Sequence, residues 1–178
     1  VFVMADGFMG HMREQIVVPE EDQFELMYRK IAEPSETVLD RQDFLDVNVA
    51  PMPVFGRGLK AHVTSSCHDE HGMRNLSDPE VMHRYVMRPI EKILTHRDDI
   101  VQVQDKSEGT TIALVSCGTV SRSARAAARL ARNEGLNIGT LRLLTCWPFP
   151  DQEVRMVANR VDHMLVLENN TGQLYPYI

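Results

Sequence analysis

The stretch TIALVSC-GTVS-RSARAAARLARNE-G-LNIGTLRLL, residues 111–144, decides the fold of this chain. It begins with an apolar run that is typical of a strand buried on both faces of a parallel sheet. A turn with one glycine follows, then an alanine- and arginine-rich segment, a further glycine and a second apolar run. Strand, turn, helix, glycine and strand in this order predict one βαβ unit.

The segments after this turn can be assigned in more detail. Ser121 or Ser123 should cap the helix, and Gly135 should end it. Alanines at helical spacing form a stripe that can lie close to a sheet, and arginines form the outer face. Residues 138–144 should return as a parallel strand through a right-handed crossover. Beyond Trp147-Pro148-Phe149-Pro150, we expect Asp151 to cap a helix at 152–160 and a third strand at 163–168.

The preceding half of the chain is less regular. We expect a buried strand at 1–5, a helix at 20–32, an irregular connector at 34–60, a short strand at 59–64 and a polar loop at 65–79. Ser77 or Asp78 should cap a helix that starts at Pro79, runs to about Arg97 and is kinked by Pro89. The charged turn at 105–109 is the expected domain boundary.

Composition narrows the class of protein. The chain has 178 residues, 43% hydrophobic residues and a net charge of −6, which fits a globular protein and argues against a nucleic-acid binder. No apolar run approaches the roughly 20 residues that span a bilayer, and the start lacks a secretory signal. Three cysteines without a C-x-x-C pair cannot build a zinc or iron–sulfur site alone, and free thiols suit the cytoplasm. Because Val1 lies inside an apolar run and Ile178 directly follows a motif, we expect a piece of a longer protein.

The turn after the first strand is a candidate anion site. Gly118, Thr119 and Ser121 join a strand to a helix N-terminus, where backbone N–H groups and the helix dipole favour an anion. The turn has neither a G-x-G-x-x-G nor a G-K-[ST] motif, so a plain connecting turn is the favoured interpretation. No G-x-S-x-G elbow supports a hydrolase.

Two polar segments are candidates for a substrate site or a subunit interface. His68, Asp69 and Glu70 lie in a histidine-rich loop that also contains His71 and follows His62. We expect this loop to hydrogen-bond a neighbouring subunit or a carboxylate ligand and not to bind a metal, because convergent ligands are not indicated. In residues 10–14, His11, Arg13 and Glu14 follow a predicted strand; they fit a substrate carboxylate site or a structural ion pair equally well.

Several motifs occur together in one order. They are Asp6-Gly7 with Gly10-His11-Met12-Arg13-Glu14, His62-Val63-Thr64 with His68-Asp69-Glu70-His71-Gly72, Ser121-Arg122-Ser123-Ala124, Glu134-Gly135 with Leu141-Arg142-Leu143 and Trp147-Pro148-Phe149-Pro150, and Glu168-Asn169 with Gly172-Gln173-Leu174. With these motifs the chain resembles the C-terminal half of the alpha subunit of 2-oxoacid:ferredoxin oxidoreductases, and most of all the 2-oxoglutarate (KorA-type) branch.

The resemblance implies an α/β fold. Residues 1–20 would end a thiamine-pyrimidine domain with its last strand, residues 21–108 would form a connector, and residues 109–178 would form a truncated, parallel-sheet domain like the C-terminal domain of transketolase.

The resemblance also implies an activity. This is the oxidative decarboxylation of a 2-oxoacid such as 2-oxoglutarate to acyl-CoA, with electrons passed to ferredoxin. Thiamine diphosphate, Mg²⁺ and an iron–sulfur cluster would belong to the full complex, with none expected in this chain alone. The implied partners are a beta subunit that carries the thiamine diphosphate-binding half, ferredoxin and coenzyme A, with small ferredoxin-like and gamma subunits as further candidates. The alternatives are a stand-alone nucleotide- or CoA-binding α/β module and a two-component 2-oxoacid dehydrogenase subunit.

Overall fold

A computed structural model describes residues 5–33, 51–58 and 66–178 of the chain. It divides into two compact units, one made of residues 1–16 and 97–178 and the other of residues 17–96. The strand expected at 59–64, with His62, lies outside the described residues. Of the strand expected at 1–5, only Ala5 is described.

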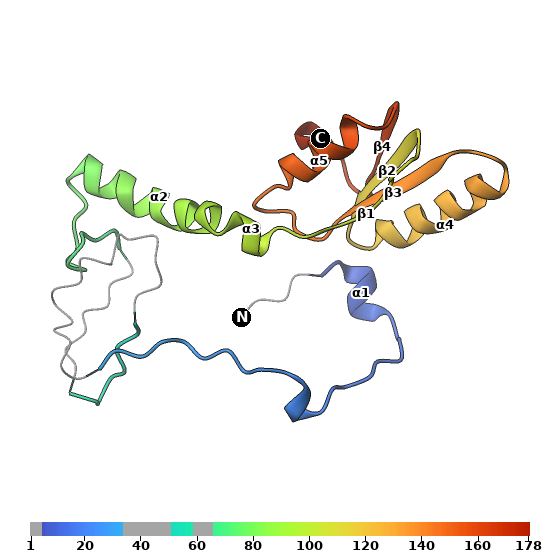
Figure 1. Ribbon diagram of the computed structural model, residues 1–178. Helices are drawn as coiled ribbons and strands as arrows, with labels where there is room; N and C mark the ends of the chain where they lie inside the picture. The colour runs from blue at the N-terminus through green and yellow to red at the C-terminus, as the bar shows by residue number, and fades with distance from the viewer. Residues whose placement is uncertain (1–4, 34–50, 59–65) are drawn as a thin grey trace. The chain divides into compact units, whose positions relative to one another are not determined.

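The first unit is built on a four-stranded sheet (Figure 1). Its strands are β1 (Val103–Lys106), β2 (Ile112–Cys117), β3 (Ile138–Leu143) and β4 (His163–Leu167), in the spatial order β1-β3-β2-β4. Strand β2 is parallel to both β3 and β4, whereas β1 is antiparallel to β3. The predicted βαβ unit is therefore confirmed, but the sheet is mixed and not purely parallel.

The unexpected strand β1 lies where the sequence predicted a domain boundary. Asp105 and Lys106 pair with Leu141 and Thr140 of β3, so the sheet unit begins before residue 109. Strand β1 is short and lies at the edge of the sheet, where its side chains are mostly polar and exposed. Its sequence therefore lacks the apolar pattern that predicts a strand. The turn that follows it packs closely on β3. A Cβ atom on Gly139 would lie 2.5 Å from the Lys106 carbonyl oxygen and 2.5 Å from Ser107 Cα.

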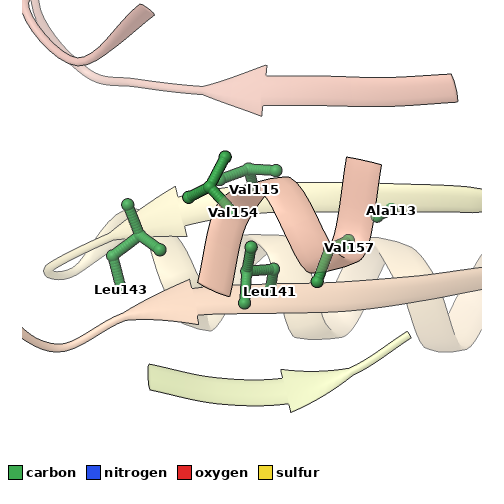
Figure 2. Close-up of a cluster of buried hydrophobic side chains, with 6 residues drawn as sticks. All are labelled: Ala113, Val115, Leu141, Leu143, Val154 and Val157. Atoms are coloured by element: carbon green, nitrogen blue, oxygen red, sulfur yellow. The ribbon is translucent and has the colours of Figure 1, made fainter. Parts of the chain in front are cut away.

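Two helices cover opposite faces of the sheet. Helix α4 (Val120–Asn133) packs Ala124 and Ala128 on one face against Leu114 and Ile138. Helix α5 (Asp151–Ala158) packs Val154 and Val157 on the other face against four sheet side chains, Ala113, Val115, Leu141 and Leu143 (Figure 2). The alanine stripe allows the close approach that was expected, and Gly135 ends α4 at φ 90°.

Both expected side-chain caps of these helices are wrong. Thr119 is the N-cap of α4 and makes no side-chain capping hydrogen bond. Ser121 is instead buried, and its hydroxyl lies 3.1 Å from that of Ser116, because the first turn of α4 packs on β2. Asp151 is the first residue of α5, preceded by the buried Pro150, and it pairs with Arg97.

The remaining helices of this unit are short. They are α1 (Gly7–His11), α3 (Arg97–Ile100) and the 3-10 turn η3 (Tyr175–Tyr177). Arg97 anchors α3 to α5 by ion pairs of 3.1 Å to Asp151 and 2.7 Å to Glu153. The Thr145 hydroxyl, on the loop after β3, donates to the Ile100 carbonyl at 3.0 Å and accepts from the Gln102 N–H at 3.0 Å. These contacts fix the entry to the sheet.

The second unit contains one long helix, α2 (Pro79–Thr95), within its described part. Asp78 caps it by accepting from the N–H groups of Glu80 and Val81, and Pro89 lies inside it, as predicted. The helix expected at 20–32 is wrong, because only the 3-10 turn η1 (Glu21–Gln23) forms there. Apart from Ala32, its apolar side chains are exposed, so little packing is available to stabilise a helix at this position. Across the described residues, no helix has both the length and the apolarity needed to cross a membrane.

Candidate functional site

The candidate site is a cavity of about 720 Å³ in the first unit. It lies at the carboxyl ends of the parallel strands, with lining residues from the segments after β2, β3 and β4. The segment after β2 leads into α4 on one face, and the segment after β3 leads into α5 on the other. A crevice opens where neighbouring connections diverge in this way, and it is the usual ligand position in open α/β sheets.

The wall after β2 is the turn that the sequence singled out as an anion site. Gly118, at φ 62°, and Thr119 both line the cavity. The Thr119 hydroxyl donates a 2.6 Å hydrogen bond to the Asp6 carboxylate, which also accepts from the Met9 N–H. These two bonds hold the pKa of Asp6 below its usual value. The anion beside this turn is thus a carboxylate of the chain itself, and the buried Ser121 hydroxyl points elsewhere.

The wall after β3 is apolar. Trp147, 54% exposed, and Phe149 line the cavity, while Pro148 and Pro150 are fully buried. The Phe149 ring lies 5.7 Å from that of Tyr177, which also lines the cavity. Buried prolines alternating with aromatic residues therefore fix the backbone and present two large rings to the cavity.

The wall after β4 is a loop that holds itself in shape. Glu168 accepts hydrogen bonds from the N–H groups of Leu174 at 2.7 Å and Tyr175 at 2.9 Å. Asn170 accepts from the N–H groups of Gly172 and Gln173. Desolvation alone would raise the pKa of Glu168, but the backbone hydrogen bonds outweigh it and place the pKa below its usual value. At neutral pH the cavity thus contains two ionised carboxylates, from Asp6 and Glu168.

Two thiols complete the lining. Cys117 ends β2, Cys146 follows β3, and their Sγ atoms lie 3.0 Å apart. Burial, followed by the neighbouring Cys146 sulfur, raises the pKa of Cys117 to about 11.

The other predicted site residues lie outside this cavity. His11 ends α1 and is exposed, as is Arg13. Glu14 forms an ion pair with Arg122 of α4, with a distance of 3.8 Å between the charged groups. This ion pair fits the structural alternative for Glu14, while the substrate or subunit-interface role of His11, Arg13 and Glu14 stays a prediction.

The histidine-rich loop belongs to the second unit. The His68 ring packs edge-on against Tyr85 of α2 at 4.7 Å, and its Nδ1 lies 3.3 Å from the Ser66 carbonyl oxygen. Asp69 accepts from the N–H groups of His71 and Met73, and Glu70 pairs with Arg84 at 3.3 Å. In the part of the chain that the structure describes, no three His, Cys, Asp or Glu side chains are placed to hold a metal ion.

Sequence reasoning missed the contributions of Asp6, Trp147 and the thiol pair to one cavity. A usable signal existed for Trp147 and Glu168, because both follow predicted strands, and the carboxyl ends of parallel strands meet at one edge. Asp6 and Thr119 are separated by 113 positions, and nothing in the sequence links them.

Two comparisons with known proteins show which proteins this α/β domain resembles. Residues 110–178 match the protein family described as pyruvate:ferredoxin oxidoreductase core domain II. The chain's fold also resembles a solved 2-oxoglutarate:ferredoxin oxidoreductase from Magnetococcus marinus, described with 2-oxoglutarate, coenzyme A and succinyl-CoA bound. The TM-score is 0.74 at 22% identity, and the match covers 90% of this chain and 28% of the solved chain.

Sequence relatives show which subunit the chain is similar to. The chain is 41% identical over 181 residues to the 2-oxoglutarate synthase subunit KorA of Methanothermobacter thermautotrophicus, a match that covers 98% of this chain and 46% of that subunit. It is 36% identical to the KorA subunit of Methanocaldococcus jannaschii, with the same coverage of both chains. The chain spans about half the length of these relatives. The predicted resemblance is confirmed: the chain is similar over nearly its whole length to part of the KorA subunits.

Proposed function

We propose that the chain is part of an enzyme that decarboxylates 2-oxoglutarate oxidatively, forms succinyl-CoA and passes the electrons to ferredoxin. The observation that carries this proposal is the similarity to KorA subunits over nearly the whole chain, which includes every wall of the cavity. The 2-oxoglutarate, coenzyme A and succinyl-CoA bound to the Magnetococcus marinus enzyme support the same substrate and product. We place the enzyme in the cytoplasm.

Thiamine diphosphate, when bound in the full complex, would supply the carbanion and electron-sink chemistry of the reaction. A diphosphate–Mg²⁺ site needs oxygen ligands that are free to converge on the metal. In the cavity, Glu168 and Asn170 already accept backbone N–H bonds, and Asp6 is bound to Thr119. Ionised Asp6 and Glu168 would also repel a diphosphate. We therefore assign the diphosphate and its Mg²⁺ to the beta subunit, and the iron–sulfur cluster to a partner.

In this proposal the first unit shapes a cleft and docks on the beta subunit. The sheet domain, which includes β1 and so begins before the expected residue 109, would be like the C-terminal domain of transketolase. The residues between 21 and this domain would connect, and residues 1–20 would end a thiamine-pyrimidine domain. The exposed Trp147 ring gives the cavity an apolar surface for a partner or substrate group. The two carboxylates disfavour the stand-alone nucleotide- or CoA-binding module, because both place negative charge where a phosphate would bind.

A substrate panel tests the proposed reaction. The full-length alpha subunit, purified with its partners under anaerobic conditions, should reduce ferredoxin when given 2-oxoglutarate and coenzyme A. We include 2-oxoisovalerate because residues of this chain are also 40% identical, over 63 residues, to the ketoisovalerate oxidoreductase subunit VorB of Methanothermobacter thermautotrophicus. Higher kcat/KM with 2-oxoisovalerate or pyruvate than with 2-oxoglutarate would overturn the substrate assignment.

The two outlying polar segments are proposed as subunit contacts. Arg13 is exposed and costly to bury without a partner, and the His68 loop is ordered by its own Asp69 hydrogen bonds. We expect Arg13→Ala and His68→Ala to weaken assembly of the alpha and beta subunits on size-exclusion chromatography. Arg129→Ala, an exposed position on α4, is the matched control. Unchanged assembly and kinetics in both variants would leave these segments as plain connector.

A further inference from the structure

Two of the three cysteines in the chain form a close pair. The Sγ atoms of Cys117 and Cys146 are 3.0 Å apart, and all three cysteines are free thiols. Cys67 lies in the other unit, on the loop that carries His68. The pair is not a sequence motif, because 29 positions separate its members.

The fold holds both thiols on fixed backbone. Cys117 is the last residue of β2 and pairs with Leu143 in β3, so the ends of the two strands are side by side. Just beyond, the N–H groups of Leu144 and Thr145 donate to the Gln102 carbonyl at 3.0 and 3.2 Å. A disulfide has sulfurs about 2.05 Å apart. The thiols therefore need to approach by only about 1 Å to bond.

The two thiols differ in access. Cys146 is exposed, whereas Cys117 is half-buried. The thiolate is the nucleophile in thiol–disulfide exchange. The raised pKa of Cys117 keeps that thiol protonated at neutral pH. Cys146 is thus the attacking thiol, and Cys117 the one that resolves the intermediate.

We propose that Cys117 and Cys146 are a reversible oxidation site that closes to a disulfide when a low-molecular-weight disulfide is present. The Cys146 thiolate attacks one sulfur of the small disulfide, whose S–S bond breaks, and the first small thiolate leaves and takes up a proton. Cys117 then loses its proton to solvent and attacks Cys146 Sγ, which forms the Cys117–Cys146 bond and releases the second small thiol. The protein pair is oxidised by two electrons, and the small disulfide is reduced to two thiols.

The bond would join two walls of the cavity. Cys117 belongs to the wall after β2, Cys146 to the wall after β3, and both line the opening between them. Oxidation therefore links the segments that diverge at the crevice and changes the lining at its apolar side. This inference does not depend on the 2-oxoacid chemistry, because the pair and the oxidant suffice for it.

The test uses the full-length subunit in its purified complex, handled anaerobically and then treated with oxidised glutathione. Trypsin separates the two thiols, because Lys106 and Arg122 bracket Cys117 while Arg142 and Arg155 bracket Cys146. We expect both cysteines to lose alkylation together, a cross-linked peptide pair to appear in mass spectrometry, and dithiothreitol to restore both thiols.

Two variants give the controls. Cys117→Ser should stop the reaction at a glutathione adduct on Cys146, and Cys67→Ser should leave cross-linking unchanged. The proposal is overturned if glutathione stays on Cys146 in the wild-type protein or if either thiol pairs with Cys67. It is also overturned if Cys117 and Cys146 can still be fully alkylated after treatment. Each of these readouts is independent of enzyme activity, so a wrong substrate assignment would not affect them.

Discussion

The sheet region, residues 97–178, and the described part of residues 17–96 are organised in opposite ways. In the sheet region, buried side chains from α4, α5 and the strands β2 and β3 form two apolar clusters. In 17–33, 51–58 and 66–96, Ala32 is the hydrophobic side chain that is buried, while Val17, Met27 and Tyr28 are 89%, 88% and 84% exposed. Burial of apolar area is the main force that stabilises a fold. The sheet region thus carries its own core, whereas the described part of the other region buries little apolar area.

The largest loss of stability should come from truncating a buried side chain in the core between the sheet and α5. Leu141 of β3 is fully buried on the face of the sheet that α5 covers (Figure 2). Leu141→Ala should lower the free energy of opening of β2 and β3 by about 2–5 kcal/mol, because it removes apolar contacts and leaves a cavity. Hydrogen exchange of β-strand amides in the full-length subunit measures this. A change below about 1 kcal/mol would mean that the sheet region has no tightly packed core.

The next effect comes from a close backbone approach. Gly139→Ala should destabilise the sheet by about 1–3 kcal/mol, because its Cβ would meet backbone atoms of Lys106 and Ser107 at 2.5 Å. Gly10→Ala is the matched control, since a Cβ there meets nothing within 4 Å. Exchange of the β1 and β3 amides reports the difference. Equal protection in the two variants would show that the β1 turn does not pack on β3 as described.

An effect of comparable size should follow from uncoupling α3 from α5. Arg97→Met removes the charge-assisted bonds to Asp151 and Glu153 and should cost about 1.5–3 kcal/mol. The hydrogen bond from Arg97 lowers the pKa of Glu153, so the stabilisation is present above the ordinary carboxyl pKa. It is lost as the pH falls through the lowered folded-state value. The gap between wild type and Arg97→Met should therefore close in acid.

Asp98→Asn is the control for this charge effect. The Asp98 side chain is 95% exposed and lies 3.6 Å from Arg97, so screening leaves it little influence. If the stability gap for Arg97→Met persisted at a pH where Glu153 is protonated, the ion pair would not be its cause.

The smallest effect is expected in the other region. Met27→Ser and Tyr28→Ser should change the opening free energy of β2 and β3 by less than about 0.5 kcal/mol, since both side chains are exposed and belong to the other unit. The same hydrogen-exchange experiment measures them. A loss comparable to that of Leu141→Ala would contradict the division into two independently packed regions.

The same contrast explains what the sequence could predict. The βαβ unit was predictable because its signals are local: an apolar run, an alanine stripe and Gly135 at a helix end. The helix expected at 20–32 does not form, because helices this short depend on packing of one face. Strand β1 was missed because its pairing with β3, and not its composition, makes it a strand.

The candidate site was only partly predictable. Gly118 and Thr119 do line the cavity, but the group beside them is Asp6, from a distant part of the sequence. The pairing of Cys117 with Cys146 likewise depends on the register of β2 and β3. Contacts of this kind arise from tertiary structure and leave no periodic signal in the sequence.

One measurement tests most directly whether the cavity of the sheet region is the part that serves the enzyme. Trp147 lines the cavity at 54% exposure, and Leu130 of α4 is 59% exposed without lining it, so the two offer matched substitutions. In the assembled complex, Trp147→Ala should lower 2-oxoglutarate-dependent ferredoxin reduction by at least about tenfold through misplacement of reacting groups. Leu130→Ala should leave the rate unchanged. Equal rates in both variants would contradict the assignment of function to this cavity.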